Sequence, residues 1–427
     1  MPKNKKRKKS SAQPEMGGYK HFLNDMRETL HVMEISGNFS DLSNEFKRTA
    51  YNHNIGIWNP TAANEFINSG ELKYFAEKSK RSYRERSYKV DNSFISLYQL
   101  QLFHAFCAAR AIELEKQTGD KKHPKAIVMR EAQQKCIKAF NISFLSSYLK
   151  ITTSLCNPAH KYYSANIHQA PFYKEKPKLE YIFDVYGFPA QKCMMNVNGS
   201  KRPAFQLAKP LHSVNKQIEW IRVDVTLLKN LYKGNKKVLD VFIQSHALSR
   251  MKERLNLLDQ EAINYALWEN THTISQFEIY KGYLLLPFKV FGIKIGYLVA
   301  NVTADKLLFR TFLFITHNST PEGMKLRKLT GLGKEDITYW KIDRLSTFVK
   351  LKEENYPGLI QLFSEAGLGM LMELKDKKFT IDLMQAANLD GLTEYINRGK
   401  NEFKLITLDW DTPVSDAENE SCLQLNE

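Results

Sequence analysis

Residues 238–255 read VLDVFIQSHALSRMKERL, and this stretch decides the fold class. Its first part, residues 238–244, has the β-branched and aromatic composition of a strand. The second part, SHALSRMKERL, spaces its apolar residues as a helix does, with Ser245 as the expected N-cap. A strand that runs directly into a helix predicts a domain that combines a sheet with helices.

The helix predicted from Ser245 has two chemically distinct faces. At about 100° per residue, His246, Arg250 and Arg254 lie on successive turns of one face. The other face carries the apolar side chains of Leu248, Met251 and Leu255. We therefore expect the helix to bury its apolar face and to present one histidine and two arginines together.

The residue types on the polar face suit chemistry on a phosphodiester. Two guanidinium groups can grip phosphate oxygens and stabilise the added charge of a pentacoordinate transition state. A histidine can move a proton to or from a ribose oxygen near neutral pH. RNA supplies its own nucleophile, the 2′-hydroxyl, and no His, Cys or acidic cluster has metal-ligand spacing, so we expect no metal and no cofactor. An ordinary amphipathic helix with a solvated polar face is the alternative interpretation of the same sequence pattern.

The flanking segments predict a largely antiparallel sheet. Alternating residues indicate strands at 179–186 and 219–225, and Asn198-Gly199 indicates a hairpin turn. A second helix, Asp259 to Asn270, precedes strands at 273–280, 283–290, 292–302 and 306–316, the last two forming a hairpin. In the strand at 292–302, one face is expected to carry Ile293, Ile295, Tyr297 and Val299, and the other Lys294 and Gly296.

The order of these elements resembles that of a known group of RNases. The residues that carry the resemblance are His246-Ala247, Arg250-Met251, Glu253-Arg254 and, in the last strand, Arg310. Residues 240–318 resemble the RelE-like toxin superfamily, which includes colicin-type RNases. The resemblance implies metal-independent cleavage of RNA, often tRNA or ribosome-bound mRNA. It also implies that His246 and Arg250 lie at the active face and that Arg310 reaches it from the last strand.

Four further residues of this region are candidates for the site. His317 follows the last strand, just before a predicted helix, and is a candidate second acid–base group; a loop histidine with a local hydrogen bond is the alternative. Lys281 and Tyr283 flank the turn at Gly282 and, with Lys294, are candidates for binding nucleic acid. Because the turn itself needs glycine, polar neighbours are expected there without any function as well.

The whole chain predicts an α+β protein in several parts. Residues 19–160 are expected to form a helical domain, 161–325 a basic α+β domain with an antiparallel sheet, and 326–408 a helical C-terminal region. Residues 1–18 form a basic head and residues 409–427 an acidic tail. We expect both ends to be disordered, because blocks of like charge repel one another.

The charge distribution predicts a polyanionic partner. The chain has 427 residues and a net charge of +16, with 62 Lys and Arg against 46 Asp and Glu. The head and the tail offset each other, whereas residues 161–330 hold 25 basic and 13 acidic residues, a net +12. We therefore expect the central domain to bind nucleic acid, with RNA preferred over DNA.

The composition argues against several other classes of protein. No apolar run is long enough to span a membrane, and none follows the basic N-terminus as in a secretory signal. The five cysteines are odd in number and far apart, which fits a reducing compartment: Cys107, Cys136, Cys156, Cys193 and Cys422. We expect a cytoplasmic protein without a membrane partner.

Two functional hypotheses remain open. The first is a metal-independent ribonuclease of toxin or defence type, which the helical regions, a protein inhibitor or a regulatory partner control. The second is a non-catalytic nucleic-acid-binding or scaffold protein, in which the same basic face only positions phosphates. His246 distinguishes the two hypotheses. In the first it is needed for the rate of RNA cleavage, whereas in the second it is dispensable for the affinity for nucleic acid.

Overall fold

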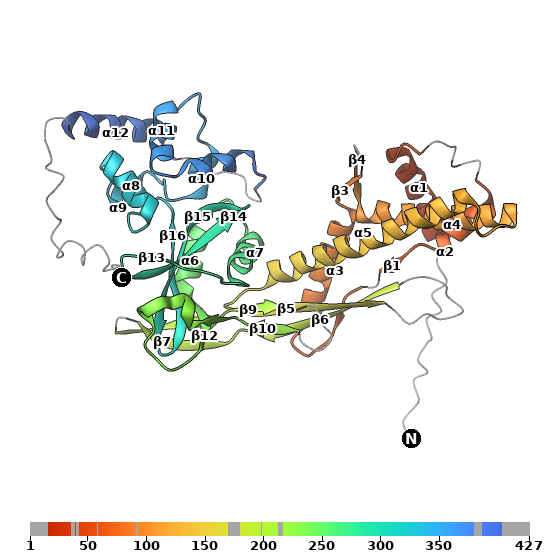
Figure 1. Cartoon of the computed structure of the whole chain (residues 1–427), viewed down its shortest axis with the longest axis horizontal. Coiled ribbons are helices and arrows are strands. Elements are labelled where there is room, and N and C mark those ends of the chain that lie inside the picture. The colour runs from red at the N-terminus through yellow and green to blue at the C-terminus, as the bar shows by residue number, and fades with distance from the viewer. Residues whose placement is uncertain are drawn as a thin grey trace, which may run out of the picture. The chain divides into compact units, whose positions relative to one another are not determined.

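The computed structural model describes residues 16–35, 39, 42–57, 59–90, 93–169, 180–197, 199–211, 217–379 and 387–403 (Figure 1). The chain divides into two compact units. Unit 1 comprises Met1–Thr152, Ser164–Gly187 and His212–Gln217, and unit 2 comprises Thr153–Tyr163, Phe188–Leu211 and Ile218–Glu427. Most of the expected basic head and all of the expected acidic tail lie outside the described residues.

Unit 1 is mainly helical. Its helices are α1 (Met16–Val32), α2 (Asn44–Asn52), α3 (Ser69–Arg84), α4 (Leu97–Thr118) and most of α5 (Pro124–Leu155). Capping boxes begin α3, with Asn68 and Glu71, and α4, with Ser96 and Gln99, and pair backbone groups of the first turns. Helix α4 contributes to two buried clusters, one shared with α1 and α2 and the other with α5, so it forms the centre of the unit.

Short strands complete unit 1. They are β1 (Gly56–Ile57), β2 (Thr61–Ala62), β3 (Arg86–Val90) and β4 (Ser93–Ser96). Strands β3 and β4 form a hairpin, while β1 and β2 pair in parallel with β6 (Glu180–Pro189), which also pairs with β5 (Lys161–Gln169).

Unit 2 contains an eight-stranded sheet in the order β13-β14-β15-β16-β12-β8-β7, with β11 also paired to β12. Its strands are β7 (Lys192–Val197), β8 (Ser200–Gln206), β11 (Arg222–Asp224), β12 (Val238–Gln244), β13 (Glu278–Tyr280), β14 (Tyr283–Val290), β15 (Ile293–Thr303) and β16 (Lys306–Phe314). Strands β12 and β16 run parallel and the other neighbours antiparallel. The expected hairpin is confirmed as β15 and β16. A separate ladder joins β9 (Ala208–Pro210) to β10 (Ile218–Trp220), and the 3-10 helix η2 (Val225–Leu231) follows β11.

Helices cover this sheet and share its core. After α6 (Ser245–Arg254) and α7 (Gln260–Thr271) come α8 (Pro321–Thr330), α9 (Lys334–Tyr339), α10 (Leu345–Val349), α11 (Pro357–Glu365), η3 (Gly369–Asp376) and α12 (Leu389–Phe403). Met251 of α6, Phe309 of β16 and Phe348 of α10 belong to one buried cluster. The region expected to stand apart at 326–408 therefore belongs to the same unit as the sheet, because its apolar faces complete the sheet's core.

Two local expectations are wrong. The N-cap of α6 is Gln244 rather than Ser245, and its side chain makes no capping hydrogen bond. A β-bulge adds one residue to β15 opposite Phe288 and Lys289, so Lys294 reaches the side of Tyr297 and its Nζ donates to the Tyr297 hydroxyl at 3.0 Å. The expected placement of these two side chains on opposite faces fails because strict alternation requires a strand without a bulge.

The α+β fold class is confirmed, with a helical N-terminal part and an antiparallel-rich sheet that helices flank. Among the helices of the described ranges, none combines the length and the apolar character that crossing a bilayer requires.

Candidate functional site

One face of the unit 2 sheet gathers polar side chains from several strands. Side chains alternate between the two faces along a strand, so the pairing of the strands shows which residues share a face. Five residues lie on one side of the sheet, each from a different strand: Arg202 (β8), Phe242 (β12), Leu308 (β16), Asn301 (β15) and Tyr283 (β14). Gln244 ends β12 on this side, and His246 follows in the first turn of α6. We call Arg202, Gln244, His246, Tyr283, Asn301 and Arg310 the arginine face.

A β-bulge determines where Arg310 points. Val299 of β15 lies opposite Thr311, and Ala300 lies opposite Phe309, so Arg310 is one extra residue in β16. Bulges redirect the side chains that they carry. With the Asn301 amide turned so that both its ends are satisfied, Arg310 Nη1 donates to the Asn301 oxygen at 3.1 Å. This bond places the guanidinium on the arginine face rather than in the core on the other side of the sheet.

Two buried donor atoms at this face have no hydrogen-bond partner among the described residues. They are Nε of Arg310 and Nε2 of Gln244, whose side chain is buried. A buried donor without a partner is costly, so an acceptor from a bound molecule would stabilise both groups. Burial lowers the pKa of Arg310, an effect that Tyr283 opposes and Arg202 reinforces, so these three side chains act on one another. The guanidinium stays charged at neutral pH.

His246 lies among these arginines. Burial lowers the pKa of His246 below its ordinary value, and the charges of Arg250 and Arg202 lower it further. Arg310 acts in the same direction, whereas the Glu253 carboxylate raises the pKa. His246, Arg250 and Arg310, which the family resemblance places at one active face, are thus close enough to interact. Because its pKa is lowered, the imidazole is neutral at pH 7 and can accept a proton.

Arg250 and Arg254 share a helix face but have different surroundings. Arg250 is partly exposed and pairs with Glu253, with Nη1 and Oε2 2.7 Å apart. The side chain of Arg254 is only 11% exposed and pairs with the buried carboxylate of Asp343. Arg344 also reaches Glu253, at 3.5 Å. Arg254 therefore ties α6 to the segment between α9 and α10, whereas the Arg250 side chain remains partly exposed to solvent.

His317 is held by its own loop. Its Nδ1 accepts the backbone N–H of Ser319 at 3.1 Å, the local hydrogen bond of the alternative interpretation. Burial, and then the charges of Lys334, Arg254 and Arg250, lower the pKa of His317 to about 4. A neutral, largely enclosed imidazole whose Nδ1 is occupied suits a structural role better than proton exchange with a substrate.

The three candidates for binding nucleic acid have separate surroundings. Tyr283 belongs to the arginine face. Lys281 is exposed at the turn, with Nζ 5.7 Å from the ring centre of Tyr280. The amine of Lys294 already has a partner within the protein, because its Nζ lies 2.6 Å from a carboxylate oxygen of Glu322. Only Tyr283 is therefore positioned to act together with His246 and Arg310.

Arg202, Gln244 and Asn301 belong to the arginine face but were not expected from the sequence. Arg202 follows the Asn198-Gly199 turn that was expected, and its neighbour Lys201 makes the pair basic, which was an available signal. Gln244 and Asn301 gave no signal, because an amide in a strand is unremarkable until its neighbours are known.

Other reactive groups do not suggest a second kind of chemistry. Within the described ranges, no three His, Cys, Asp or Glu side chains gather as a metal site requires. Burial raises the pKa of Cys107 and Cys156 to about 12 and that of Cys136 to about 11, so these thiols are poor nucleophiles.

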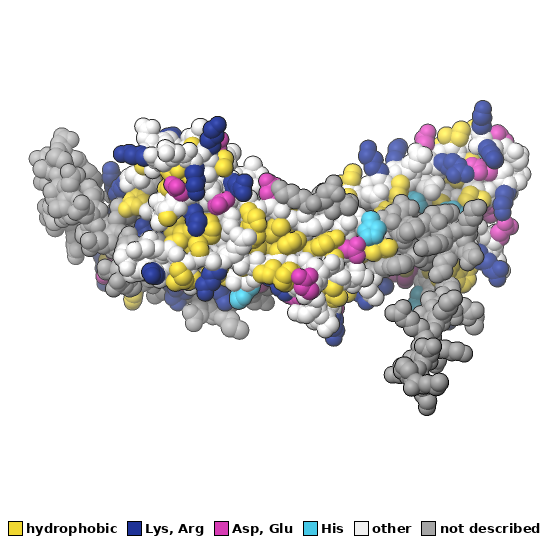
Figure 2. All heavy atoms as spheres, turned by 90° about the horizontal axis from the view of Figure 1, so that it is seen from below, with side chains coloured by type: hydrophobic (Ala, Val, Ile, Leu, Met, Phe, Trp, Pro, Cys, Tyr) yellow, Lys and Arg dark blue, Asp and Glu magenta, His cyan; other side chains and the backbone are white. Residues whose placement is uncertain are grey.

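Lys and Arg side chains are spread over the molecular face drawn in Figure 2, with Asp and Glu side chains between them. They do not gather there in one patch. The charge excess alone therefore does not locate a site; the arginine face is defined by its geometry and its unpaired donors.

In comparisons with known proteins, no protein-family model, no curated protein and no solved structure matches this chain.

Proposed function

We propose that the arginine face binds single-stranded RNA and cleaves it without a metal ion. The observation that carries the proposal is the cluster of His246 with Arg202, Arg250 and Arg310, next to two buried donors without a partner. Phosphate oxygens are acceptors only, and they carry the charge that arginines bind best. Tyr283 offers a ring on which an unpaired base can stack.

The geometry supports a transphosphorylation. Neutral His246 takes the proton of the ribose 2′-hydroxyl, and the 2′ oxygen attacks the adjacent phosphorus. The bond from phosphorus to the 5′ oxygen breaks, this oxygen takes a proton from water, and the resulting hydroxide takes the proton back from His246. Arg310 and Arg202 bind the phosphoryl oxygens, on which negative charge grows in the transition state. The products are a 2′,3′-cyclic phosphate and a 5′-hydroxyl end.

A nucleic-acid-binding role without catalysis is the alternative. It is favoured by the surroundings of His317: burial lowers its pKa to about 4 and its Nδ1 is bound to its own loop, so at neutral pH it lacks the proton that a second, acidic group would donate. In that case the arginine face positions phosphates, with RNA or DNA as the partner.

Cleavage of RNA by the purified full chain in EDTA tests the proposal. A single-stranded RNA and the DNA of the same sequence serve as substrates, and the ends of the products are identified. We expect 2′,3′-cyclic phosphate ends from RNA and intact DNA, because DNA lacks the 2′ nucleophile. Intact RNA at high protein concentration in several buffers would contradict the enzymatic proposal.

Two variants separate catalysis from binding. His246→Ala should lower the cleavage rate about 10²- to 10⁴-fold while the affinity for RNA changes little, since the histidine only moves a proton. Arg250→Ala should weaken binding and reduce its salt dependence. His272→Ala, at the C-cap of α7 and stacked on Trp268, is the matched control and should cleave at the normal rate. If His246→Ala lowers only affinity, the protein is a binder.

A further inference from the structure

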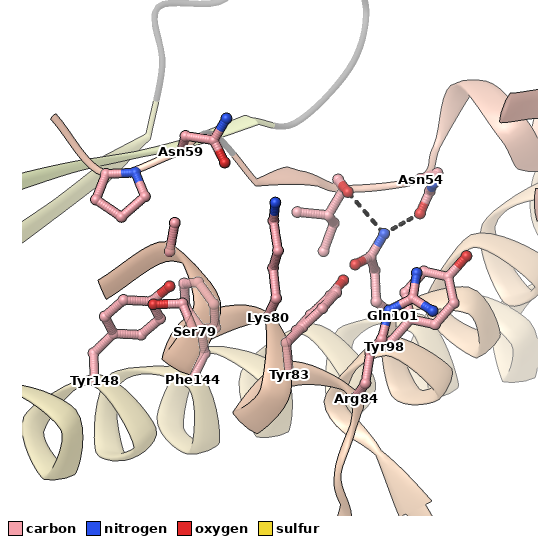
Figure 3. A pocket seen from close by; sticks show the side chains of 13 residues that line it. Asn54, Asn59, Ser79, Lys80, Tyr83, Arg84, Tyr98, Gln101, Phe144 and Tyr148 are labelled. Carbon is pink, nitrogen blue, oxygen red and sulfur yellow. Dashed lines mark hydrogen bonds between the residues drawn. The ribbon is translucent and has the colours of Figure 1, made fainter. Parts of the chain in front are cut away.

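Unit 1 contains a cavity of about 270 Å³ that lies among three of its helices (Figure 3). Helix α3 contributes Ser79, Lys80, Tyr83 and Arg84 from one face, since these positions recur at helical spacing. Helices α4 and α5 add Tyr98, Gln101, Phe144 and Tyr148, and the segment before α3 adds Asn54 and Asn59. The cavity is therefore built by the core of the unit rather than by a single loop.

The cavity holds a buried acceptor without a partner. Gln101 is 1% exposed, and its Nε2 donates to the Ile55 carbonyl at 2.7 Å and to the Asn54 side-chain oxygen. Both partners are acceptors, so the orientation of the amide is determined and Oε1 is left to accept. No donor among the described residues reaches Oε1. Because an unpaired buried acceptor is costly, a ligand with an N–H group would stabilise it.

The walls and the mouth of the cavity differ in character. Phe144, Tyr148 and Tyr83 form aromatic walls, and burial raises the pKa of both tyrosines, so their hydroxyls are uncharged. Lys80 is exposed and extends its amine into the pocket, and Arg84 lies over the Tyr98 ring at 5.4 Å. Among the described residues that line the cavity, none is Asp or Glu. A planar, uncharged ring fits the walls, and an anionic group fits the mouth.

We propose that this cavity binds a nucleoside monophosphate whose base carries an exocyclic amine. The amine donates to Gln101 Oε1, the base lies against the aromatic walls, and the phosphate meets Lys80 and Arg84. A volume of about 270 Å³ lies just below the roughly 300–1,000 Å³ of drug-sized pockets, so it admits one nucleotide rather than two. A free nucleotide and the phosphorylated 5′ end of an RNA strand offer the same chemistry. This site is independent of the arginine face.

Calorimetric titration of the full chain with AMP, CMP and GMP tests the proposal. We expect at least one of them to bind about tenfold more tightly than both ribose 5-phosphate, which lacks the base, and purine riboside 5′-monophosphate, which lacks the amine. Equal affinity for all of these ligands, or no binding of the three nucleotides at about 1 mM, would overturn it.

Variants of exposed side chains avoid damage to the fold. Lys80→Gln should lower the affinity for the nucleotide about tenfold while the affinity for the corresponding nucleoside stays the same, because only the phosphate contact is lost. Lys73→Gln, an exposed lysine of α3 outside the cavity, is the matched control and should bind normally. Loss of nucleoside and nucleotide binding in equal measure in Lys80→Gln would contradict the assigned phosphate position.

Competition by short RNA identifies the source of the nucleotide. A 5′-phosphorylated tetranucleotide that displaces the nucleotide, when its 5′-hydroxyl counterpart does not, indicates a strand end as the ligand. Failure of both to compete indicates a free nucleotide. Either result supports the pocket, whereas equal competition by both tetranucleotides contradicts a specific phosphate position at Lys80.

Discussion

The cavity of unit 1 and the arginine face of unit 2 both contain buried polar atoms that find no partner in the described part of the chain, but the atoms are of opposite kinds. Gln101 Oε1 in the cavity is an acceptor, whereas Arg310 Nε and Gln244 Nε2 at the arginine face are donors. An unpaired acceptor among aromatic rings is suited to a hydrogen bond from the N–H of a base. Unpaired donors among arginines are suited to hydrogen bonds to phosphate oxygens. On the two proposals above, the unpaired acceptor of the cavity meets the base of a nucleotide, whereas the unpaired donors of the arginine face meet phosphate oxygens.

Among the variants that compare the two regions, the largest effect should come from Arg310. Arg310→Gln removes a charged donor from the position where transition-state charge grows, so cleavage of RNA should slow about 10²- to 10³-fold. Nucleotide binding by unit 1 should be unchanged, and Lys80→Gln should show the reverse pattern. Single-turnover rates and calorimetry on the same preparations measure both. A change in both activities in either variant would break the distinction between the two regions.

Arg254 and Arg250 should differ in what they stabilise. Arg254→Met removes the nearest partner of the buried Asp343 carboxylate and, among the described residues, leaves only Arg344, at 3.9 Å, so it should lower the free energy of unfolding by about 3 kcal/mol. Arg250→Met breaks a partly exposed pair and should cost less than about 1 kcal/mol, but it should weaken RNA binding. Urea titrations give the stabilities. Similar losses for the two variants would mean that Arg254 does not tie α6 to the C-terminal helices.

One buried histidine, His104, should make unit 1 sensitive to acid. Burial, with help from the charge of His53, lowers the pKa of His104 to about 4, below its ordinary value of about 6.5 in an unfolded chain. The unfolded state therefore binds a proton first, so stability is complete above pH 6.5 and decreases towards pH 4, by up to about 3 kcal/mol. His104→Gln should flatten this decrease in urea titrations between pH 7.5 and 4.5. An unchanged slope would show that His104 is not the responsible group.

The smallest effect should be a shift of the pH profile of cleavage. Because His246 must be neutral to accept a proton, the rate should rise with pH through a pKa below the ordinary histidine value of about 6.5 and then level off. The Glu253 carboxylate raises this pKa, so Glu253→Gln should move the rising limb to lower pH. A limb that moves to higher pH, or a profile without one, would remove His246 from the role of base.

Several features followed from the sequence because they depend on neighbouring residues. The junction of β12 and α6, the shared face of His246 and Arg250, and the basic central segment depend on composition and on a helical period, which act over a few residues. The hairpin of β15 and β16 is equally local. The short turn between these strands leaves little choice of pairing.

Other features required the tertiary structure. Asp343 reaches Arg254 across 89 residues, and the pairing of β8 with β12 brings Arg202 to His246. The bulge that turns Arg310 and the one that moves Lys294 are changes of register, which a strict alternation cannot anticipate. The cavity of unit 1 exists only once α3, α4 and α5 pack together. Periodicity therefore determined which side of each element is polar, whereas long-range pairing decided which polar sides meet.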